Sequence, residues 1–259
     1  MYGNNAAARS FATEARSIVS HGAHPMQTSP QKVAKLREHA MFNGLGPQAV
    51  ERLSGCATIR KIKGGTTIFS KDDPGTGLFA VSAGVVKIRV PSPDGREAVL
   101  NLVYAGEIFG EIALLDGQPR TADAVAMTDC ELIAVDRRDF LALVREEPRI
   151  ALGMITLLCA RLRWAGQQFE EVVFLNLPGR LAKLLVRLLQ KGQASSGPQK
   201  LAITQRELSL LTGTSRESVN KQLRAWSKLK WVRLERGGIV VLSPDAIQAI
   251  AAAGADRDA

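Results

Sequence analysis

The chain has 259 residues, of which 46% are hydrophobic and 23% are charged, so it has the composition of a globular protein with room for two ordinary domains. Its longest apolar run, 150–160, is shorter than the roughly 20 residues that a membrane-spanning helix needs. Residues 1–30 contain no compact apolar stretch, so we expect a flexible leader rather than a secretory signal. These features exclude a membrane protein and favour a cytoplasmic one.

Positive charge is concentrated in the last third of the chain. The formal net charge is +9, and residues 180–259 hold 14 Lys+Arg against 6 Asp+Glu. The other 179 residues hold 20 Lys+Arg against 19 Asp+Glu and are nearly neutral. This asymmetry indicates a nucleic-acid-binding domain attached to a domain with another role.

Cysteine and histidine give no pattern of a metal or redox site. Cys56, Cys130 and Cys159 have no paired spacing, and we expect each to be a small buried hydrophobic residue. The three histidines lie in or near the leader and are expected at the solvent-exposed surface: His21, His24 and His39. We therefore predict no metal site, no catalytic constellation and no enzymatic activity.

Short β-rich runs separated by turn residues fill the first half of the chain. Gly, Pro and Asp, which favour tight turns, dominate the segments between these runs. Many short strands at regular spacing predict a jelly-roll type of β architecture, preceded by a helical region at about 31–56. The expected strands are 66–69, 78–84, 85–90, 98–103 and 130–136.

From Pro148 to Phe174 the hydrophobic period changes to that of a helix. Apolar residues recur at alternating steps of four and three, which is the a/d seam of a coiled coil. A helix packed on its own domain would also need an apolar stripe, but so narrow a stripe favours a homodimer helix. The expected interface residues are Ile155, Leu158, Leu162, Ala165, Phe169 and Val172, which continue a seam that begins at Ala151.

The segment 203–242 has the pattern of a winged helix-turn-helix. Thr204 and Glu207 can form a capping box, and Gly213 can end the first helix in the left-handed conformation that a tight turn requires. Ser215 then caps a second helix, and Gly237 lies between the two strands of a wing. The residues expected to contact DNA are Thr204, Arg206, Ser215, Arg216, Glu217, Asn220 and Lys221.

The sequence ITQRELSLLTGTSRESVNKQL (203–223) resembles the recognition element of the Crp/Fnr family, and the resemblance extends from about Leu36 to Leu242. In that family an Arg, a Glu and a second Arg of this helix read the bases of a TGTGA-like palindrome. The matching positions here hold Arg216, Glu217 and Lys221, so a lysine replaces one bidentate arginine.

The segment 106–126 is similar to the phosphate-binding cassette of the same family. Independently of the resemblance, Gly110 lets backbone N–H groups approach an anion, Glu111 can accept from a ribose hydroxyl, and Arg120 with Thr121 can hold phosphate oxygens. The alternative is that Glu111 and Arg120 pair with each other in a partly buried turn. The expected effector-binding residues are Gly110, Glu111, Ile112, Ala113, Arg120 and Thr121.

The dimer helix departs from the cyclic-AMP-binding pattern. The family's receptor for cyclic AMP has an adjacent Thr and Ser that contact adenine, whereas Ala165 and Gly166 stand at those positions. If the polar edge of adenine were buried without hydrogen-bond partners, the free energy of binding would be less favourable by roughly 1–3 kcal/mol. Either the base is bound differently, the ligand is another molecule, or no ligand is needed.

The sequence thus predicts an α+β chain: a jelly-roll, cyclic-nucleotide-binding-like domain, a long dimerisation helix and a winged helix-turn-helix. We expect the boundaries to be leader 1–30, effector domain 31–147, dimer helix 148–176 and DNA-binding domain 177–259, with a hinge near 177–179. The expected function is a homodimeric transcriptional regulator of palindromic double-stranded DNA, controlled by cAMP or cGMP and contacting RNA polymerase. The alternative is a constitutive DNA binder whose β domain is a scaffold or a polymerase-docking surface.

Overall fold

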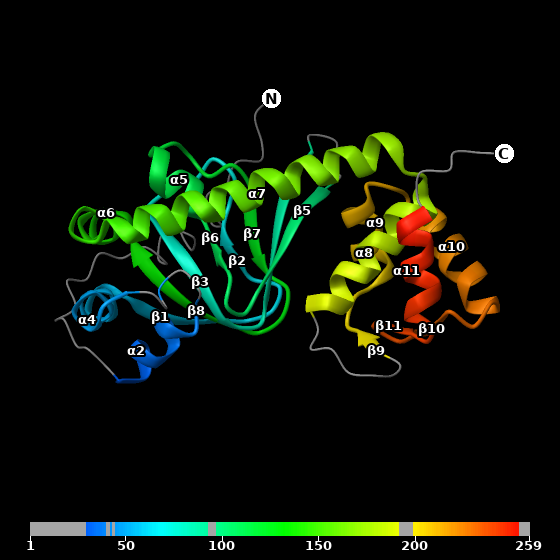
Figure 1. The fold of residues 1–259 in the computed structure, drawn as a ribbon, viewed down its shortest axis with the longest axis horizontal. Helices are drawn as coiled ribbons and strands as arrows, with labels where there is room; N and C mark the ends of the chain where they lie inside the picture. The colour runs from blue at the N-terminus through cyan, green and yellow to red at the C-terminus, as the bar shows by residue number, and fades with distance from the viewer. Residues whose placement is uncertain (1–29, 40–41, 43–44, 93–96, 192–198, 254–259) are drawn as a thin grey trace, which may run out of the picture. The chain divides into compact units, whose positions relative to one another are not determined.

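The structure is a computed structural model that describes residues 30–39, 42, 45–92, 97–191 and 199–253 (Figure 1). Almost all of the expected leader, including His21 and His24, lies outside these residues. The chain forms two compact units, one from the residues up to 88 with 102–153 and one from 89–101 with 154–259. No helix in the described part of the chain is long and apolar enough to cross a membrane.

Two four-stranded sheets form the β-roll that the spacing of short strands predicts. Their strand orders are β1-β8-β3-β6 and β2-β7-β4-β5. The sequence pattern missed β1, β6 and β7, of which β6 has only two residues and β7 only four. The bounds are Thr58–Ile62 for β1, Thr67–Phe69 for β2, Gly77–Ala83 for β3, Val85–Pro91 for β4, Glu97–Tyr104 for β5, Ile108–Phe109 for β6, Asp123–Ala126 for β7 and Cys130–Asp136 for β8.

Three phenylalanine rings stack inside the β-roll. The ring centroids of Phe79 and Phe109 are 5.2 Å apart, and Phe69 lies 5.9 Å from each of them. They belong to a core that includes strand residues from both sheets, such as Val81 and Ala124. This aromatic stack is a rigid base for the loop that follows β6.

Helices α2 (Pro30–Arg37), α4 (Pro47–Cys56) and α6 (Arg137–Glu146) accompany the β-roll, and α5 (Glu111–Asp116) lies between β6 and β7. Helices α2 and α4 lie within the region 31–56 that was expected to be helical. After α6, helix α7 spans Pro148–Phe174, which confirms the long helix expected at these bounds.

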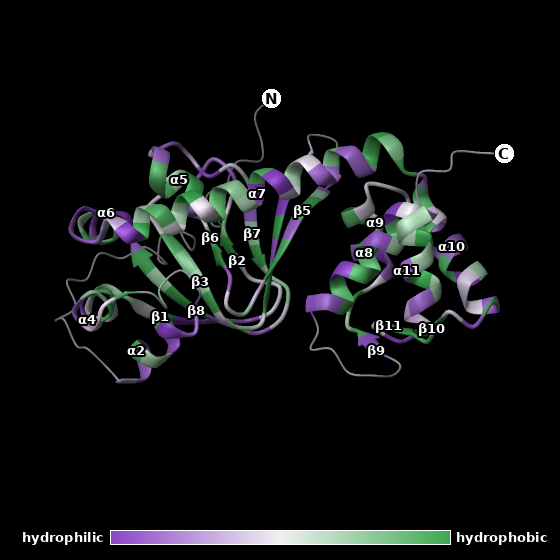
Figure 2. Cartoon of the chain, in the orientation of Figure 1, coloured by the Kyte–Doolittle hydropathy of each residue, from purple (hydrophilic) through white to green (hydrophobic). Residues whose placement is uncertain are grey.

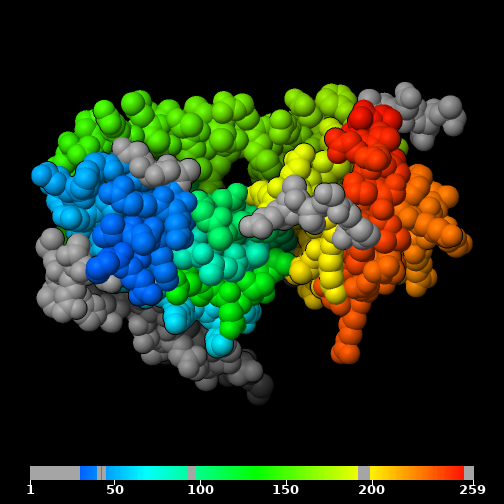
Figure 3. Space-filling view, turned by 60° about the horizontal axis from the view of Figure 1, so that its bottom comes forward, coloured from blue at the N-terminus to red at the C-terminus, as the bar shows by residue number. Residues whose placement is uncertain are grey.

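The C-terminal part of the second unit, after α7, is a winged helix-turn-helix. Its small sheet has the order β10-β11-β9, and α8 packs on α9 and α11. In the space-filling view the orange segment that includes the two wing strands stands out from the surface of this unit (Figure 3). The bounds are Leu177–Lys191 for α8, Gln199–Leu201 for β9, Gln205–Thr212 for α9, Arg216–Lys228 for α10, Val232–Glu235 for β10, Gly238–Val241 for β11 and Pro244–Ala253 for α11.

The turn between α7 and α8 differs from the expected hinge. Leu177, Pro178 and Gly179 already belong to the first turn of α8, so the break consists of Leu175 and Asn176. The Asn176 side chain accepts a hydrogen bond from the backbone N–H of Gly179 at 3.0 Å and so caps α8. Proline is compatible with this first turn because its missing N–H would have no helical partner there.

Candidate effector and DNA-binding sites

Arg120 lies at the centre of the predicted cassette and is only 4% exposed. Its Nη1 donates to the carbonyl of Gly110 and its Nη2 to the carbonyl of Gly77, both at 2.7 Å. The guanidinium carbon lies 4.2 Å from the ring centroid of Phe69, a cation–π distance. The aromatic stack thus supports the guanidinium, and two backbone carbonyls set its orientation.

Nearby carboxylates favour the charged form of Arg120 and so oppose the effect of its burial. Desolvation lowers the pKa of Arg120, and the negative charges of Asp73 and Glu111 oppose that shift. Among the described residues, Arg120 Nε has no hydrogen-bond partner, although it is buried. A buried N–H donor without an acceptor is costly, so this nitrogen is a donor that an additional acceptor would satisfy.

Two glycines make room for this arrangement. Gly110 adopts a left-handed backbone with φ of 81°, and a Cβ there would lie 2.8 Å from Arg120 Nη1. A Cβ on Gly75 would lie 2.5 Å from the Cβ of Ala113 in α5. Both positions require glycine because any side chain would push α5 or Arg120 out of place.

The other predicted cassette residues lie on α5 and just beyond Arg120. Glu111 is the first residue of α5 and is 1% exposed, and Ala113 is 2% exposed. Ile112, by contrast, is 41% exposed, and Thr121 is also exposed. Two hydrogen bonds of Arg120 go to backbone carbonyls, and the negative charge of Glu111 acts on Arg120 as well, so the expected alternative of a Glu111–Arg120 pair stays open.

Sequence reasoning missed two side chains that support the cassette. Phe69 carries the guanidinium of Arg120, and Arg137 Nε donates to the carbonyl of Leu114 at 2.7 Å near the C-terminal end of α5. A contact between residues far apart in the sequence leaves no local pattern that predicts it. The only sequence features that point to these two residues are the alternation of side chains along β2, for Phe69, and the position of Arg137 at the start of α6.

The helix-turn-helix has the caps that the sequence predicts. Thr204 Oγ1 accepts from the backbone N–H of Glu207, and the Glu207 carboxylate accepts from the N–H of Thr204 at 2.7 Å. Gly213 ends α9 with φ of 63°, and Ser215 caps α10 through the N–H of Ser218 at 3.0 Å. The hydroxyls of Thr204 and Ser215, expected at DNA, therefore serve the helix termini in this structure.

Helix α10 buries one face and exposes the other. Its buried residues are Val219, Leu223 and Trp226, as expected. On the other side Arg216, Glu217 and Lys221 are exposed, together with Arg206 of α9, while Asn220 is half-buried. The chemistry of this surface suits a major groove, since Arg pairs with guanine edges and Glu with the amino group of cytosine.

Helix α7 carries hydrophobic residues along much of its length (Figure 2), and several of them are exposed. Leu158 is half-buried, but most of the predicted seam is accessible in the single chain, and Ala165 and Gly166 are exposed too. Exposed apolar residues at this spacing are typical of a helix that packs on a second chain. The exposed fractions are 56% for Ile155, 75% for Leu162, 71% for Phe169 and 59% for Val172.

Two expectations about single residues are wrong. His39 is 1% exposed rather than solvated, because it packs edge-on against the ring of Phe42 under α2. Of the cysteines only Cys130 is buried, whereas Cys56 is half-buried and Cys159 is exposed on α7. The described residues contain no group of three or more His, Cys, Asp or Glu side chains arranged to hold a metal ion.

Comparison with known proteins matches both parts of the chain to protein families. Residues 59–147 match the family model of the cyclic nucleotide-binding domain, and residues 179–250 match that of the Crp-like helix-turn-helix domain. These two segments contain Arg120 and the α9–α10 pair described above.

Relatives align along most of the chain. A CRP-like cAMP-activated global transcriptional regulator of Mycobacterium tuberculosis is 32% identical over 209 residues, 80% of this chain and 93% of the relative. The cyclic AMP receptor protein of Thermus thermophilus is 37% identical over 211 residues, 82% of this chain and 96% of the relative. A solved Crp/Fnr-family transcriptional regulator from Thermus thermophilus is 25% identical, with a TM-score of 0.67 over 76% of this chain and all of that one.

Proposed function

Because the chain belongs to the Crp/Fnr family of transcriptional regulators, we propose that it binds a palindromic DNA operator as a homodimer under the control of cyclic AMP. Membership of this family implies a DNA-binding domain and an effector domain. We propose in addition that the operator is palindromic, that the protein binds it as a dimer, and that the effector is cyclic AMP. The observation that carries it is the buried guanidinium of Arg120, whose Nε has no partner among the described residues.

The cassette supports an anionic, sugar-bearing ligand. Arg120 and Thr121 would hold the cyclic phosphate, with backbone N–H groups near Gly110 assisting, and Glu111 would accept from the ribose 2′-hydroxyl. A guanidinium suits this task because it stays charged when buried and offers donors in a planar fork. Cyclic AMP is preferred to cyclic GMP because the relatives from Mycobacterium tuberculosis and Thermus thermophilus are named for cyclic AMP.

The exposed seam of α7 supports the homodimer. Two copies of the stripe would bury each other in a parallel pair and place two α10 helices on one duplex. Such a dimer matches a palindrome because each subunit binds one half-site. Bound at a promoter, this assembly would contact RNA polymerase, as is typical of the family.

Nucleotide titration tests the effector proposal. We expect calorimetry to detect one cyclic AMP per chain, with weaker binding of cyclic GMP. The Arg120→Gln variant should bind cyclic AMP at least about tenfold more weakly, since it loses a charged hydrogen bond worth roughly 1.5–3 kcal/mol. Thr121→Val is the milder control because it removes only one neutral hydroxyl. Equal affinity of wild type and Arg120→Gln would contradict the assigned site.

A second candidate function is a DNA binder that needs no nucleotide. Ala165 and Gly166 favour it, because neither can offer a side-chain partner to the adenine base. In that case the β-roll would act as a scaffold or a docking surface for RNA polymerase. Absence of any nucleotide binding, combined with tight operator binding, would select this candidate.

A further inference from the structure

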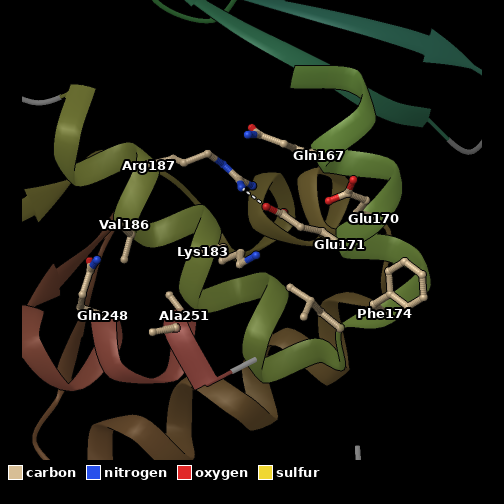
Figure 4. Close-up of a pocket in the computed structure, with 11 residues that line it drawn as sticks. Gln167, Glu170, Glu171, Phe174, Lys183, Val186, Arg187, Gln248 and Ala251 are labelled. Carbon is tan, nitrogen blue, oxygen red and sulfur yellow. Dashed lines mark hydrogen bonds and ion pairs between the residues drawn. The ribbon is translucent and has the colours of Figure 1, made fainter. Parts of the chain in front are cut away.

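A partly buried ion pair connects α7 with α8 across the break at Leu175 and Asn176. Arg187 Nη1 donates to Glu171 Oε1 at 2.6 Å, and the Glu171 side chain is only 9% exposed (Figure 4). Gln168 Nε2 donates to the second oxygen of the same carboxylate at 3.3 Å. Removing one partner of such a pair leaves an uncompensated buried charge, so the two helices are held together at this point.

The position of Arg187 makes the pair sensitive to the angle between the helices. Arg187 lies ten residues beyond Leu177, the first residue of α8, which is about 15 Å along the helix axis at 1.5 Å per residue. At that lever arm a displacement of about 1 Å corresponds to a rotation of only about 4°. A contact beside the break itself would restrict the angle far less.

Packing does little to hold this angle. A cavity of about 500 Å³ lies beside the ion pair, lined by the last turns of α7, by α8 and by α11. In Figure 4 Lys183, Val186 and Ala251 surround it, and the Glu171–Arg187 pair bridges its wall. Helix α8 packs extensively on α9 and α11 but makes few close contacts with α7. The helix-turn-helix therefore packs mainly on α8, and the Glu171–Arg187 pair is a side-chain link between α8 and α7.

We propose that Glu171 and Arg187 are positioning residues that set the orientation of the DNA-binding unit on the dimerisation helix and thereby the spacing of half-sites that the dimer accepts. This inference rests on the proposed homodimer. Paired recognition helices must enter the major groove one helical turn apart, so a dimer whose DNA-binding units have a fixed orientation binds half-sites at one spacing. If that orientation is less restricted, the dimer also binds half-sites at neighbouring spacings.

Operator spacing tests the proposal. Fluorescence anisotropy would measure binding of the full-length protein, with cyclic AMP, to duplexes whose two TGTGA half-sites differ in separation by single base pairs. The wild type should prefer one spacing. Glu171→Gln and Arg187→Gln should each reduce that preference by about tenfold, because each removes one partner of a coupled, partly buried pair. Lys183→Gln, which removes a positive charge from the same helix and cavity, should keep the preference.

The charge-swapped double variant Glu171→Arg/Arg187→Glu separates positioning from folding. It should recover most of the spacing preference, whereas general loss of packing would weaken binding at every spacing equally. Unchanged preference in both single variants, or no spacing preference in a wild type that binds the palindrome, would overturn the inference. A wild type that binds no palindrome at all would instead contradict the proposed function.

Discussion

We propose that single side chains determine which base pairs and which ligand this protein recognises. Arg216 is the first residue of α10 and is exposed, where it can form a bidentate contact with a guanine. We expect Arg216→Ala to lose discrimination between operator and random DNA by roughly 1–3 kcal/mol, while weak, salt-sensitive binding remains. Anisotropy on both duplexes measures this.

Arg224 provides the matched control for Arg216. It carries the same charge on the exposed face of the same helix, but two turns from the N-terminus. Arg224→Ala should weaken binding to operator and random DNA about equally, because it lowers only the general attraction to phosphates. If Arg216→Ala also weakened binding to operator and random DNA equally, the assignment of Arg216 to base recognition would be refuted.

His39 makes the stability of the effector unit depend on pH. Burial lowers the pKa of His39, with only partial opposition from the backbone of Gly106 and from Glu38. The unfolded chain therefore takes up a proton near pH 6.5 that the folded protein excludes. Stability is complete above that pH and falls as the pH decreases below it, by at most about 1.4 kcal/mol per pH unit for one group.

The His39→Leu variant checks this dependence. Urea unfolding of the wild type should show declining stability from pH 6.5 to pH 5, and the variant should show a smaller decline because its side chain does not titrate. Identical pH profiles for the two proteins would mean that His39 does not titrate differently on unfolding.

Among the elements, α7 is the proposed dimer interface. Leu162 is 75% exposed in the single chain and lies in the middle of the seam. Leu162→Glu should shift the protein from dimer to monomer in sedimentation velocity, because it would place two carboxylates opposite each other in an apolar interface. Gln167→Glu adds the same charge on another exposed face of α7 and should leave the dimer intact. A dimeric Leu162→Glu protein would place the interface elsewhere.

Elements with strong local signals were predictable from sequence. The heptad spacing gave α7, and the capping residues Thr204 and Ser215 with Gly213 gave α9 and α10. The short strands β1, β6 and β7 were missed because hydrogen bonds to neighbouring strands, not local preference, form them. The break before α8 was misplaced by two residues because Pro178 is as compatible with a first helical turn as with a loop.

Contacts between distant residues lay beyond the sequence. Arg120 was predicted as a phosphate ligand, but its bonds to the carbonyls of Gly77 and Gly110 depend on the tertiary fold. The Glu171–Arg187 pair joins two helices across a turn and has no local signature. The burial of His39 was missed because residues near a polar leader resemble a solvated surface in composition.

For the whole molecule, control by an effector requires coupling between effector binding and operator binding. A ligand changes DNA affinity only if it binds one arrangement of the dimer more tightly than another, and the operator must then favour nucleotide binding by the same factor. Typical coupling free energies of 1–3 kcal/mol correspond to changes in affinity of about 5- to 150-fold.

The most direct test is the anisotropy of a labelled TGTGA-type palindrome titrated with the protein, with and without saturating cyclic AMP. We expect cyclic AMP to lower the operator Kd by at least about fivefold. Cyclic AMP should change binding to a scrambled duplex of the same length only a little. Equally tight operator binding with and without cyclic AMP would contradict control by this nucleotide.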